Sequence, residues 1–312
     1  MHKLLIFSSD GPEYARVFAE RAPDLSVHVY KRDDPASDAF AREMDIMFAW
    51  YFPPALIQGA ANLKWIQSTG AGADNIMAAR PLPPGVVASR MTDIFGPAMA
   101  EYALGYMLAT SLDVPRILAQ QRERRWEQFS APRVRGKTAV VVGMGSIGAE
   151  VCRTLKAAGL HVVGISRSGQ QSEYVHEAAA VSSLDEVLPR ADYLVLVIPL
   201  TDQSRGLIDG RRLRLLPASA WLINMCRGAV IVEEDLIVAL QDGIVAGAVL
   251  DVFQKEPLPA DNPLWGLPNV IVTPHISGPD DVPLNAQRFL ENFARFKRGE
   301  RLAGQVDWTR GY

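Results

Sequence analysis

Cysteine is scarce in this chain, which has two, Cys152 and Cys226, among 312 residues. There is no Cys-x-x-Cys spacing and no second pair, so the sequence carries neither a disulfide framework nor the paired thiolates of a zinc site. We therefore expect a reducing compartment, two small buried thiols without redox chemistry, and no bound metal.

The chain also lacks a strong charge of either sign and any long apolar run. Its formal net charge is −3, with 21% charged and 48% hydrophobic residues, which gives no indication of nucleic acid or a membrane surface as partner. The N-terminal apolar run covers only Leu4–Phe7, which is too short for a signal peptide or a membrane span. We interpret it as a first strand and expect a cytoplasmic protein.

What the sequence does contain is an alternation of β-rich apolar runs with helical patterns, typical of βαβ units and a parallel sheet. A length of 312 residues favours two domains. Residues 96–126 predict a long helix, interrupted near Pro115, that carries the chain from one domain to the next. The alternative is a helix wholly within one domain. The strands expected before it cover residues 3–8, 26–30, 45–50 and 65–68.

A glycine-rich turn stands between a predicted strand, residues 138–142, and a helix, with a second strand expected at 161–165. In GMGSIG, Gly143 permits the tight turn, Gly145 lets the backbone approach a pyrophosphate, and Gly148 lets helix and strand pack closely. The alternative is a merely structural turn. We predict a dinucleotide site at the start of this helix, with Gly143, Gly145, Ser146, Ile147 and Gly148 as its loop.

The residue that selects the cofactor should follow this loop by about 20 residues, where an aspartate would accept hydrogen bonds from a ribose 2′-hydroxyl. Arg167 is the nineteenth residue after Gly148, and it stands between Ser166 and Ser168. A guanidinium with two hydroxyl donors suits a 2′-phosphate, so the sequence predicts NADP(H). The alternative is that Arg167 is a surface charge and another residue selects NAD.

Three further polar residues each follow a predicted strand: Arg227, Glu256 and His275. Ligands of open parallel sheets bind at the carboxyl ends of strands, so these side chains could meet in one cleft. A planar guanidinium can bind a carboxylate, and a histidine can give a proton near neutral pH. A glutamate beside that histidine favours the imidazolium.

These motifs resemble the D-2-hydroxyacid dehydrogenase family over essentially the whole chain. The matching motifs are GMGSIG (143–148), VIPLT (197–201) leading to GLI (206–208), NMCRG (224–228), LDVFQKEPLP (250–259) and TPH (273–275). The tail, residues 299–312, looks more specifically like the glyoxylate/hydroxypyruvate reductase A branch. One departure is ISGPDDVPLNAQ after TPH, which lacks the small residues followed by threonine of many family members.

The resemblance implies an α/β fold of two Rossmann-like domains with parallel sheets and the active site in the interdomain cleft. Residues 1–98 and 280–312 would form the substrate-binding (catalytic) domain, and residues 99–279 the NADP-binding Rossmann domain. It also implies a homodimer through the crossover helix. Between Met99 and Leu112 that helix has more apolar residues than one buried stripe requires, namely Tyr102, Leu104, Tyr106, Met107 and Leu108.

The resemblance further implies the chemistry. Arg227 would hold the substrate carboxylate, His275 would protonate the carbonyl oxygen, Glu256 would keep His275 charged, and NADPH would supply the hydride. The expected reactions are glyoxylate to glycolate and hydroxypyruvate to D-glycerate. In addition to the glycine loop and residues 166–168, the cofactor would contact Pro199, Asn224 and Asp251. The substrate would contact Ala71, Gly72 and Arg227. Trp50, at the end of a predicted strand, could form a wall of the substrate pocket, and the alternative is that it packs in the core.

Two other functions stay open at this point. One is a non-catalytic NAD(P)-sensing protein, because the same family includes corepressors. The other is an NAD-dependent dehydrogenase of another D-2-hydroxy acid, which Ser166-Arg167-Ser168 disfavours.

Overall fold

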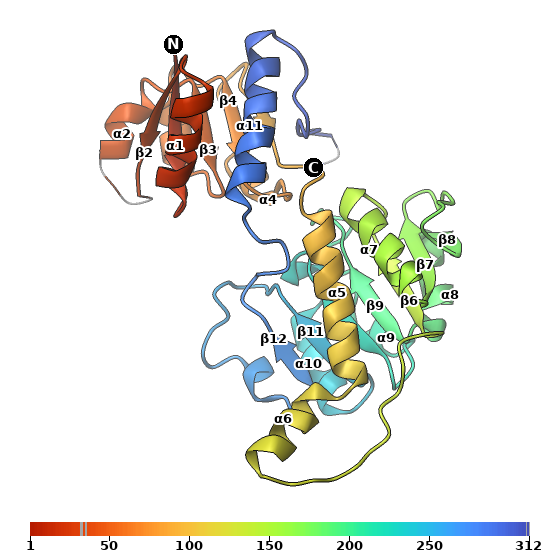
Figure 1. Cartoon of the computed structure of the whole chain (residues 1–312). Helices are drawn as coiled ribbons and strands as arrows, with labels where there is room; N and C mark the ends of the chain where they lie inside the picture. The colour runs from red at the N-terminus through yellow and green to blue at the C-terminus, as the bar shows by residue number, and fades with distance from the viewer. Residues whose placement is uncertain (32–33, 35, 310, 312) are drawn as a thin grey trace. The chain divides into compact units, whose positions relative to one another are not determined.

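The computed structural model in Figure 1 describes residues 1–31, 34, 36–309 and 311. The chain forms two compact units, one of Met1–Ile94 with Asp280–Tyr312 and one of Phe95–Pro279. The last positions of the tail motif, residues 310 and 312, lie outside the described residues. Each unit contains one parallel sheet, of five and of seven strands, which confirms the predicted α/β class.

The first unit is built on a sheet with the strand order β2-β1-β3-β4-β5. Its strands are β1 (His2–Phe7), β2 (Leu25–Val29), β3 (Ile46–Ala49), β4 (Trp65–Ser68) and β5 (Val87–Ser89). Its helices are α1 (Gly11–Arg21), α2 (Ala36–Ala41), α3 (Pro54–Gly59), α4 (Asp74–Ala78) and α11 (Val282–Lys297).

Successive side chains along each strand point to opposite faces of the sheet, so the core of this unit has one part on each face. On one face, α1 and α11 lie side by side (Figure 1) and enclose an aromatic cluster with the sheet. There Phe289 of α11 stacks on Trp65 of β4 at 5.0 Å between ring centroids and meets Phe48 of β3 at 5.1 Å. The neighbouring strand residues Met47 and Ile66 point the other way, into a second cluster. A segment from the C-terminal part of the chain thus completes the N-terminal sheet.

The second unit has the strand order β12-β11-β10-β9-β6-β7-β8, and all pairs are parallel. The strands are β6 (Thr138–Val142), β7 (His161–Ser166), β8 (Glu177–Ala180), β9 (Tyr193–Leu196), β10 (Trp221–Asn224), β11 (Gly247–Leu250) and β12 (Val270–Val272). The α-helices are α5 (Gly96–Ser111), α6 (Val114–Arg122), α7 (Ser146–Ala157), α8 (Leu184–Val187), α9 (Gly210–Leu213) and α10 (Glu233–Gln241). Short 3₁₀ turns are η1 (Val181–Ser183), η2 (Leu188–Arg190), η3 (Gly228–Val230) and η4 (Pro263–Gly266).

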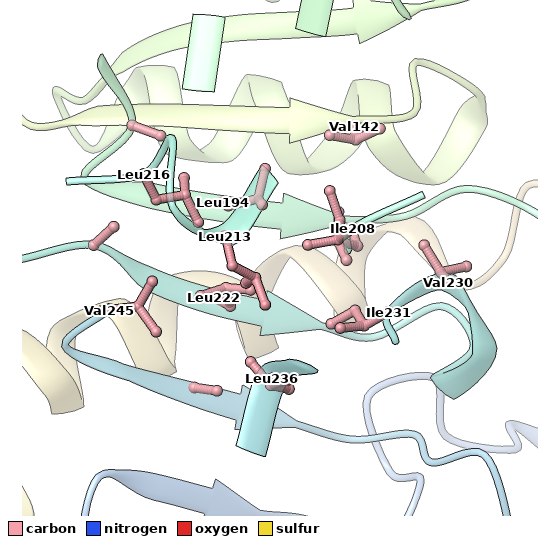
Figure 2. Close-up of a cluster of buried hydrophobic side chains, with 14 of the residues drawn as sticks. Val142, Leu194, Ile208, Leu213, Leu216, Leu222, Val230, Ile231, Leu236 and Val245 are labelled. Atoms are coloured by element: carbon pink, nitrogen blue, oxygen red, sulfur yellow. The ribbon is translucent and has the colours of Figure 1, made fainter. Parts of the chain in front are cut away.

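Helices cover the faces of this sheet. On one side, leucine, isoleucine and valine side chains of the strands meet those of α9 and α10 in a continuous core; Figure 2 labels Leu194 and Leu222 from the strands with Leu213 and Leu236 from the helices. Elsewhere in the unit α5 lies beside α7 (Figure 1). Parallel strands buried in this way read as continuous apolar runs, as β6 does.

The long helix predicted for residues 96–126 is interrupted, as expected, but at Asp113 and not at the proline itself. Asp113 has φ +52° and its side chain caps α6 by accepting from the Arg116 amide at 3.4 Å. Pro115 then occupies the first turn of α6, where its missing N–H leaves no hydrogen bond unmade.

Candidate active site

The predicted catalytic residues follow three adjacent strands of the second unit. Strands β10, β11 and β12 are neighbours in register, so their carboxyl ends lie along one edge of the sheet. Arg227 comes three residues after β10, Glu256 six after β11, and His275 three after β12. This edge is where parallel α/β sheets bind ligands.

His275 and Glu256 are in direct contact. Nδ1 of His275 lies 2.7 Å from Oε2 of Glu256, and both side chains are about one-third exposed, at 37% and 35%. The other carboxylate oxygen, Oε1, accepts from the Phe253 amide at 2.9 Å. A histidine held in this way at Nδ1 presents Nε2 away from its partner, which is the arrangement that a general acid needs.

The Glu256 carboxyl is stabilised as the anion. Its burial opposes ionisation, but the hydrogen bonds from His275 and the Phe253 amide act in the opposite sense, together with the positive charges of His275 and Arg227. The balance holds the pKa of Glu256 below its ordinary value, so the carboxylate is present at neutral pH.

The backbone of His275 has an uncommon conformation. Its φ is +55°, in the left-handed region that non-glycine residues rarely adopt. Its amide donates to the carbonyl oxygens of Asp251, at 3.0 Å, and Thr273, at 3.1 Å. Such strain persists only where the surroundings hold it, and it concentrates at functional sites.

Arg227 belongs to a tight turn that Asn224 closes. The buried Asn224 side chain donates from Nδ2 to the Arg227 carbonyl at 3.1 Å and accepts from the Cys226 amide at 3.2 Å. The guanidinium of Arg227 donates from Nη1 to the Cys226 carbonyl at 2.6 Å. Burial raises the pKa of the Cys226 thiol to about 11, so it stays protonated at neutral pH.

Gly228 allows the Arg227 turn to approach the loop that carries Glu256. A Cβ at Gly228 would lie 2.0 Å from the backbone carbonyl carbon of Phe253 and 2.4 Å from the Gln254 amide nitrogen. No side chain fits there, so the fifth residue of the NMCRG motif is a glycine for reasons of packing.

The glycine loop has the geometry that a dinucleotide needs. Gly143 has φ +115°, and a Cβ at Gly148 would lie 1.8 Å from the Gly143 carbonyl oxygen, so loop and helix touch through backbone alone. A Cβ at Gly145, the N-cap of α7, would meet nothing within 4 Å, and Gly145 and Ser146 are exposed. Open space before a helix N-terminus can accept a pyrophosphate, so these residues fit the predicted cofactor.

The predicted 2′-phosphate residues lie at the end of β7. Arg167 and Ser168 are exposed, whereas Ser166 is partly buried and its Oγ accepts from the Gly169 amide at 3.0 Å. Pro199, in the loop after β9, is also exposed, and its carbonyl accepts from the Ser204 hydroxyl at 2.7 Å. The structure therefore presents residues 167 and 168 on the surface of this unit.

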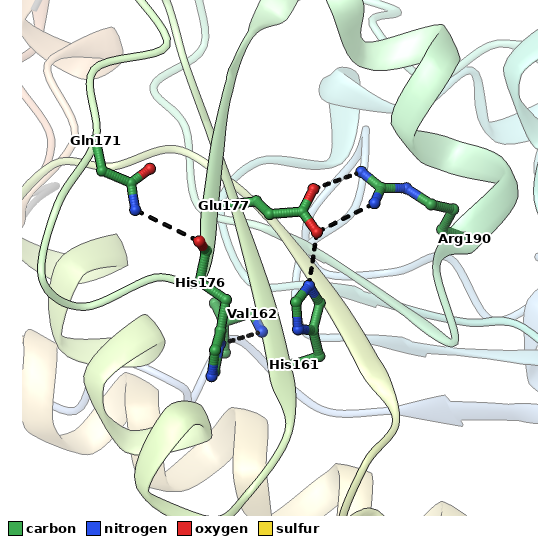
Figure 3. A network of polar contacts seen from close by, with 6 residues as sticks. All are labelled: His161, Val162, Gln171, His176, Glu177 and Arg190. Atoms are coloured by element: carbon green, nitrogen blue, oxygen red, sulfur yellow. Dashed lines mark hydrogen bonds and ion pairs between the residues drawn. The ribbon is translucent and has the colours of Figure 1, made fainter.

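A second histidine–glutamate pair lies at the beginning of β7, at the other end of that strand. Nε2 of His161 is 2.8 Å from Oε1 of Glu177, and Arg190 holds the same carboxylate with two nitrogens (Figure 3). His176 stacks on His161 and accepts from the Val162 amide. This cluster fastens the edge strand β8 and lies outside the predicted cofactor site.

The predicted substrate residues Trp50, Ala71 and Gly72 belong to the first unit. The Trp50 indole covers Gly70, where a Cβ would lie 2.0 Å from Cζ3 of Trp50. Arg90, which the sequence analysis did not single out, donates from Nη1 to the Ala71 carbonyl at 3.0 Å. Its position after β5 could have suggested it, since a cation beside this loop suits an acid substrate.

Among the residues that the structure describes, no three histidine, cysteine or acidic side chains lie together in a group that could hold a metal ion. Over the same residues, every helix is too short or too polar to cross a membrane.

Known proteins resemble this chain over most of its length. A family described as D-isomer specific 2-hydroxyacid dehydrogenase, NAD binding domain, matches residues 104–277. The chain is 33% identical over 310 residues to glyoxylate/hydroxypyruvate reductase A of Klebsiella pneumoniae, and the match covers 97% of each protein. A solved NADPH-dependent glyoxylate/hydroxypyruvate reductase of Sinorhizobium meliloti, in complex with NADP and sulfate, is 31% identical with a TM-score of 0.91 over all of both chains. A Xanthobacter autotrophicus relative solved with NADPH is 33% identical, with a TM-score of 0.89 over 100% of this chain and 99% of that one.

Proposed function

Because the chain belongs to the D-isomer specific 2-hydroxyacid dehydrogenase family, we propose that it reduces small 2-oxo acids with NADPH, glyoxylate to glycolate and hydroxypyruvate to D-glycerate. The observation that carries the proposal is the 2.7 Å contact between His275 and Glu256 at the strand ends. The names of the relatives support the choice of substrate, and the NADP-bound relatives support the choice of cofactor.

Each catalytic side chain has a defined role in this proposal. Arg227 binds the substrate carboxylate through its planar guanidinium and polarises the ketone. His275 donates the proton on Nε2 to the carbonyl oxygen, while Nδ1 stays bonded to Glu256. Glu256, kept ionised by its surroundings, stabilises the protonated imidazole before transfer. NADPH supplies the hydride that adds to the carbonyl carbon, and the product is the 2-hydroxy acid.

The cofactor is held by the second unit. The loop Gly143–Gly148 and the N-terminus of α7 receive the pyrophosphate, and Ser166, Arg167 and Ser168 receive the 2′-phosphate. By resemblance, Pro199, Asn224 and Asp251 also belong to this site; Pro199 is exposed, whereas Asn224 and Asp251 are buried and would support the site from within the unit. Trp50 and the loop at Ala71 and Gly72 are proposed to contact the substrate, the loop through its backbone N–H groups.

A panel of 2-oxo acids assayed with NADPH and with NADH tests this function. We expect NADPH oxidation with glyoxylate and hydroxypyruvate, and much slower oxidation of NADH. If NADPH binds but no 2-oxo acid is reduced, the protein is a non-catalytic NAD(P)-sensing protein, similar to the corepressors of the family, and not an enzyme. If NADH is used best, the chain is an NAD-dependent dehydrogenase of another 2-hydroxy acid.

We also propose a homodimer through the crossover helix. Leu108 lies on α5 and Leu112 directly follows the helix, one turn further along the same face. They are 41% and 47% exposed. Ile117 and Leu118 of α6 are exposed to a similar degree, at 42% and 45%. Of the apolar residues that suggested this face, Met107 is fully buried within the unit and contributes to its core instead.

The dimer is tested by mass in solution. Wild type should sediment as a dimer at micromolar concentration, and Leu108→Glu with Leu112→Glu should give a folded monomer, because two charges would be desolvated in the interface. Val238→Glu is the matched control, since Val238 is 45% exposed on α10. A monomeric wild type contradicts the proposal.

A further inference from the structure

A chain of hydrogen bonds links the crossover helix to the loop that carries His275. The hydroxyl of Tyr102, on α5, lies 2.7 Å from Oγ1 of Thr273, and Thr273 Oγ1 donates to Oδ1 of Asp251 at 2.6 Å. We infer that Tyr102 is a positioning residue for the proposed proton donor: through Thr273 and Asp251 it fixes the loop on which His275 stands. The inference rests on the proposed function for the role of His275.

We call the hydrogen-bonded chain Tyr102–Thr273–Asp251 the relay. The direction of each of its hydrogen bonds follows from the acceptor at its end, Asp251. The Asp251 carboxylate can only accept hydrogen bonds, so the single hydroxyl proton of Thr273 is donated to Asp251. The Thr273 oxygen then has only lone pairs left for Tyr102, and the phenol must donate. Burial, with the Asp251 charge, raises the pKa of Tyr102 above its ordinary value, so the phenol keeps its proton at any working pH.

Asp251 gathers the loop on both sides of His275. Its carboxylate also accepts from the Ile276 amide at 2.8 Å through Oδ1 and from the Ser277 amide at 2.8 Å through Oδ2. Its main-chain carbonyl accepts from the His275 amide itself. Residues 273, 275, 276 and 277 are therefore all bonded to a single residue.

The Asp251 end of this hydrogen-bond chain is shielded from water. Asp251 is fully buried, and Thr273 and Ser277 are 5% and 3% exposed. Hydrogen bonds to a charged group in such surroundings are stronger than exposed ones, and loss of one leaves its partner unsatisfied. A carboxylate that already accepts three hydrogen bonds from the loop acts mainly by holding that loop.

The hydrogen bonds that Asp251 and Tyr102 make with this loop explain how His275 keeps its left-handed backbone. At φ +55° the residue would relax to a commoner conformation unless its neighbours were fixed, and that relaxation would turn the imidazole relative to Glu256. Small displacements of an acid from the atom it protonates lower kcat strongly. Tyr102 supplies the outermost bond from a rigid 16-residue helix.

Isosteric and conservative variants test the relay. Thr273→Val removes the hydroxyl at nearly constant volume and should lower kcat for glyoxylate about tenfold, the effect of roughly 1.4 kcal/mol. Thr273→Ser keeps the hydroxyl and should restore most of the rate. Tyr102→Phe should lower kcat about threefold, since a neutral hydrogen bond contributes less than one to a carboxylate. NADPH affinity, measured by fluorescence titration without substrate, should change little in any of them.

Two comparisons separate the relay from a general structural role. Because Tyr102 acts only through Thr273, a variant that combines Tyr102→Phe with Thr273→Val should be no slower than Thr273→Val alone. Tyr106→Phe is the matched control: its ring lies 4.5 Å from that of Tyr102, one turn along the same helix, but it is no member of the relay. It should leave kcat unchanged.

The imidazole itself gives a readout that does not depend on turnover. The chain has five histidines, so ¹³Cε1-labelled histidine gives a spectrum simple enough to assign His275 by its loss in a His275 variant. Its signal should shift in Tyr102→Phe and Thr273→Val, return in Thr273→Ser, and stay in place in Tyr106→Phe. An unshifted signal with wild-type kcat in Tyr102→Phe or in Thr273→Val overturns the inference, as does a Thr273→Ser variant as damaged as Thr273→Val.

The two proposals fail separately. If wild type reduces no 2-oxo acid, the function is wrong, but the shift of the His275 signal still supports or contradicts the relay.

Discussion

Replacement of His275 by alanine should lower kcat for glyoxylate by about 10²–10⁴-fold, the usual contribution of a general acid. The proton that Nε2 is proposed to supply would have to come from water in the variant. NADPH affinity, measured without substrate, should stay nearly unchanged, because the residue is proposed to meet only the substrate oxygen.

The chain offers a matched control in its second histidine–glutamate pair. His161 contacts Glu177 at 2.8 Å, much as His275 contacts Glu256, and it is 39% exposed (Figure 3). It lies at the start of β7 and not beyond a strand end, so His161→Ala should keep its kcat. Retained turnover in His275→Ala would remove that residue from the mechanism, and an equal loss in both variants would point to a general effect on the fold.

The sequence predicted two features of the candidate site that depend only on the order of the elements along the chain. The glycine loop lies between β6 and α7 as expected, because the strand, the turn and the helix are contiguous and each glycine answers a local steric need. The contact of Glu256 with His275 followed from two residues placed after adjacent strands of a parallel sheet. In both cases the topology needed only the order of the elements.

Other features depend on contacts between distant residues, and no local pattern records them. Tyr102 and Thr273 are 171 positions apart, and a tyrosine in an apolar helix reads as core or interface. His275 has a left-handed backbone, and its amide donates to the carbonyl of Asp251, which follows a different strand.

The edge strand β8 was also missed, for a related reason. Its sequence, Glu-Ala-Ala-Ala, has little intrinsic preference for a strand. It is held instead by pairing with β7 and by the Glu177 bonds to His161 and Arg190. Tertiary contacts here override a weak local preference.

The choice between NADPH and NADH is expected to depend on Arg167. With Ser166 and Ser168 it can make two or three charge-assisted hydrogen bonds to a 2′-phosphate, each contributing about 1.5–3 kcal/mol. Arg167 and Ser168 are exposed, so solvent and side-chain ordering reduce the sum to a net ~3–4 kcal/mol. Wild type should then prefer NADPH by roughly 10²–10³-fold in kcat/KM, since each 1.4 kcal/mol is tenfold.

That preference should lie mainly in the KM for the cofactor. The 2′-phosphate is remote from the reacting carbon, so its contacts stabilise the ground state and the transition state equally. The structure adds one distinction among the three residues. Ser166 already accepts from the Gly169 amide, so it shapes the turn as well as offering a donor, and Ser166→Ala should weaken NADPH less than a change at Arg167.

Arg167→Asp should reverse the selectivity. The substitution removes the cation, places a like charge beside the phosphate, and supplies an acceptor for the 2′-hydroxyl of NADH. Binding of 2′,5′-ADP, which carries the phosphate without the nicotinamide, should weaken in parallel and gives a readout free of turnover. Arg214→Asp makes the same charge change on an exposed residue after α9 and should leave both cofactors unaffected. If wild type uses NADH as well as NADPH, or if Arg167→Asp binds 2′,5′-ADP as wild type does, Arg167 is a surface charge and the 2′-phosphate is recognised elsewhere.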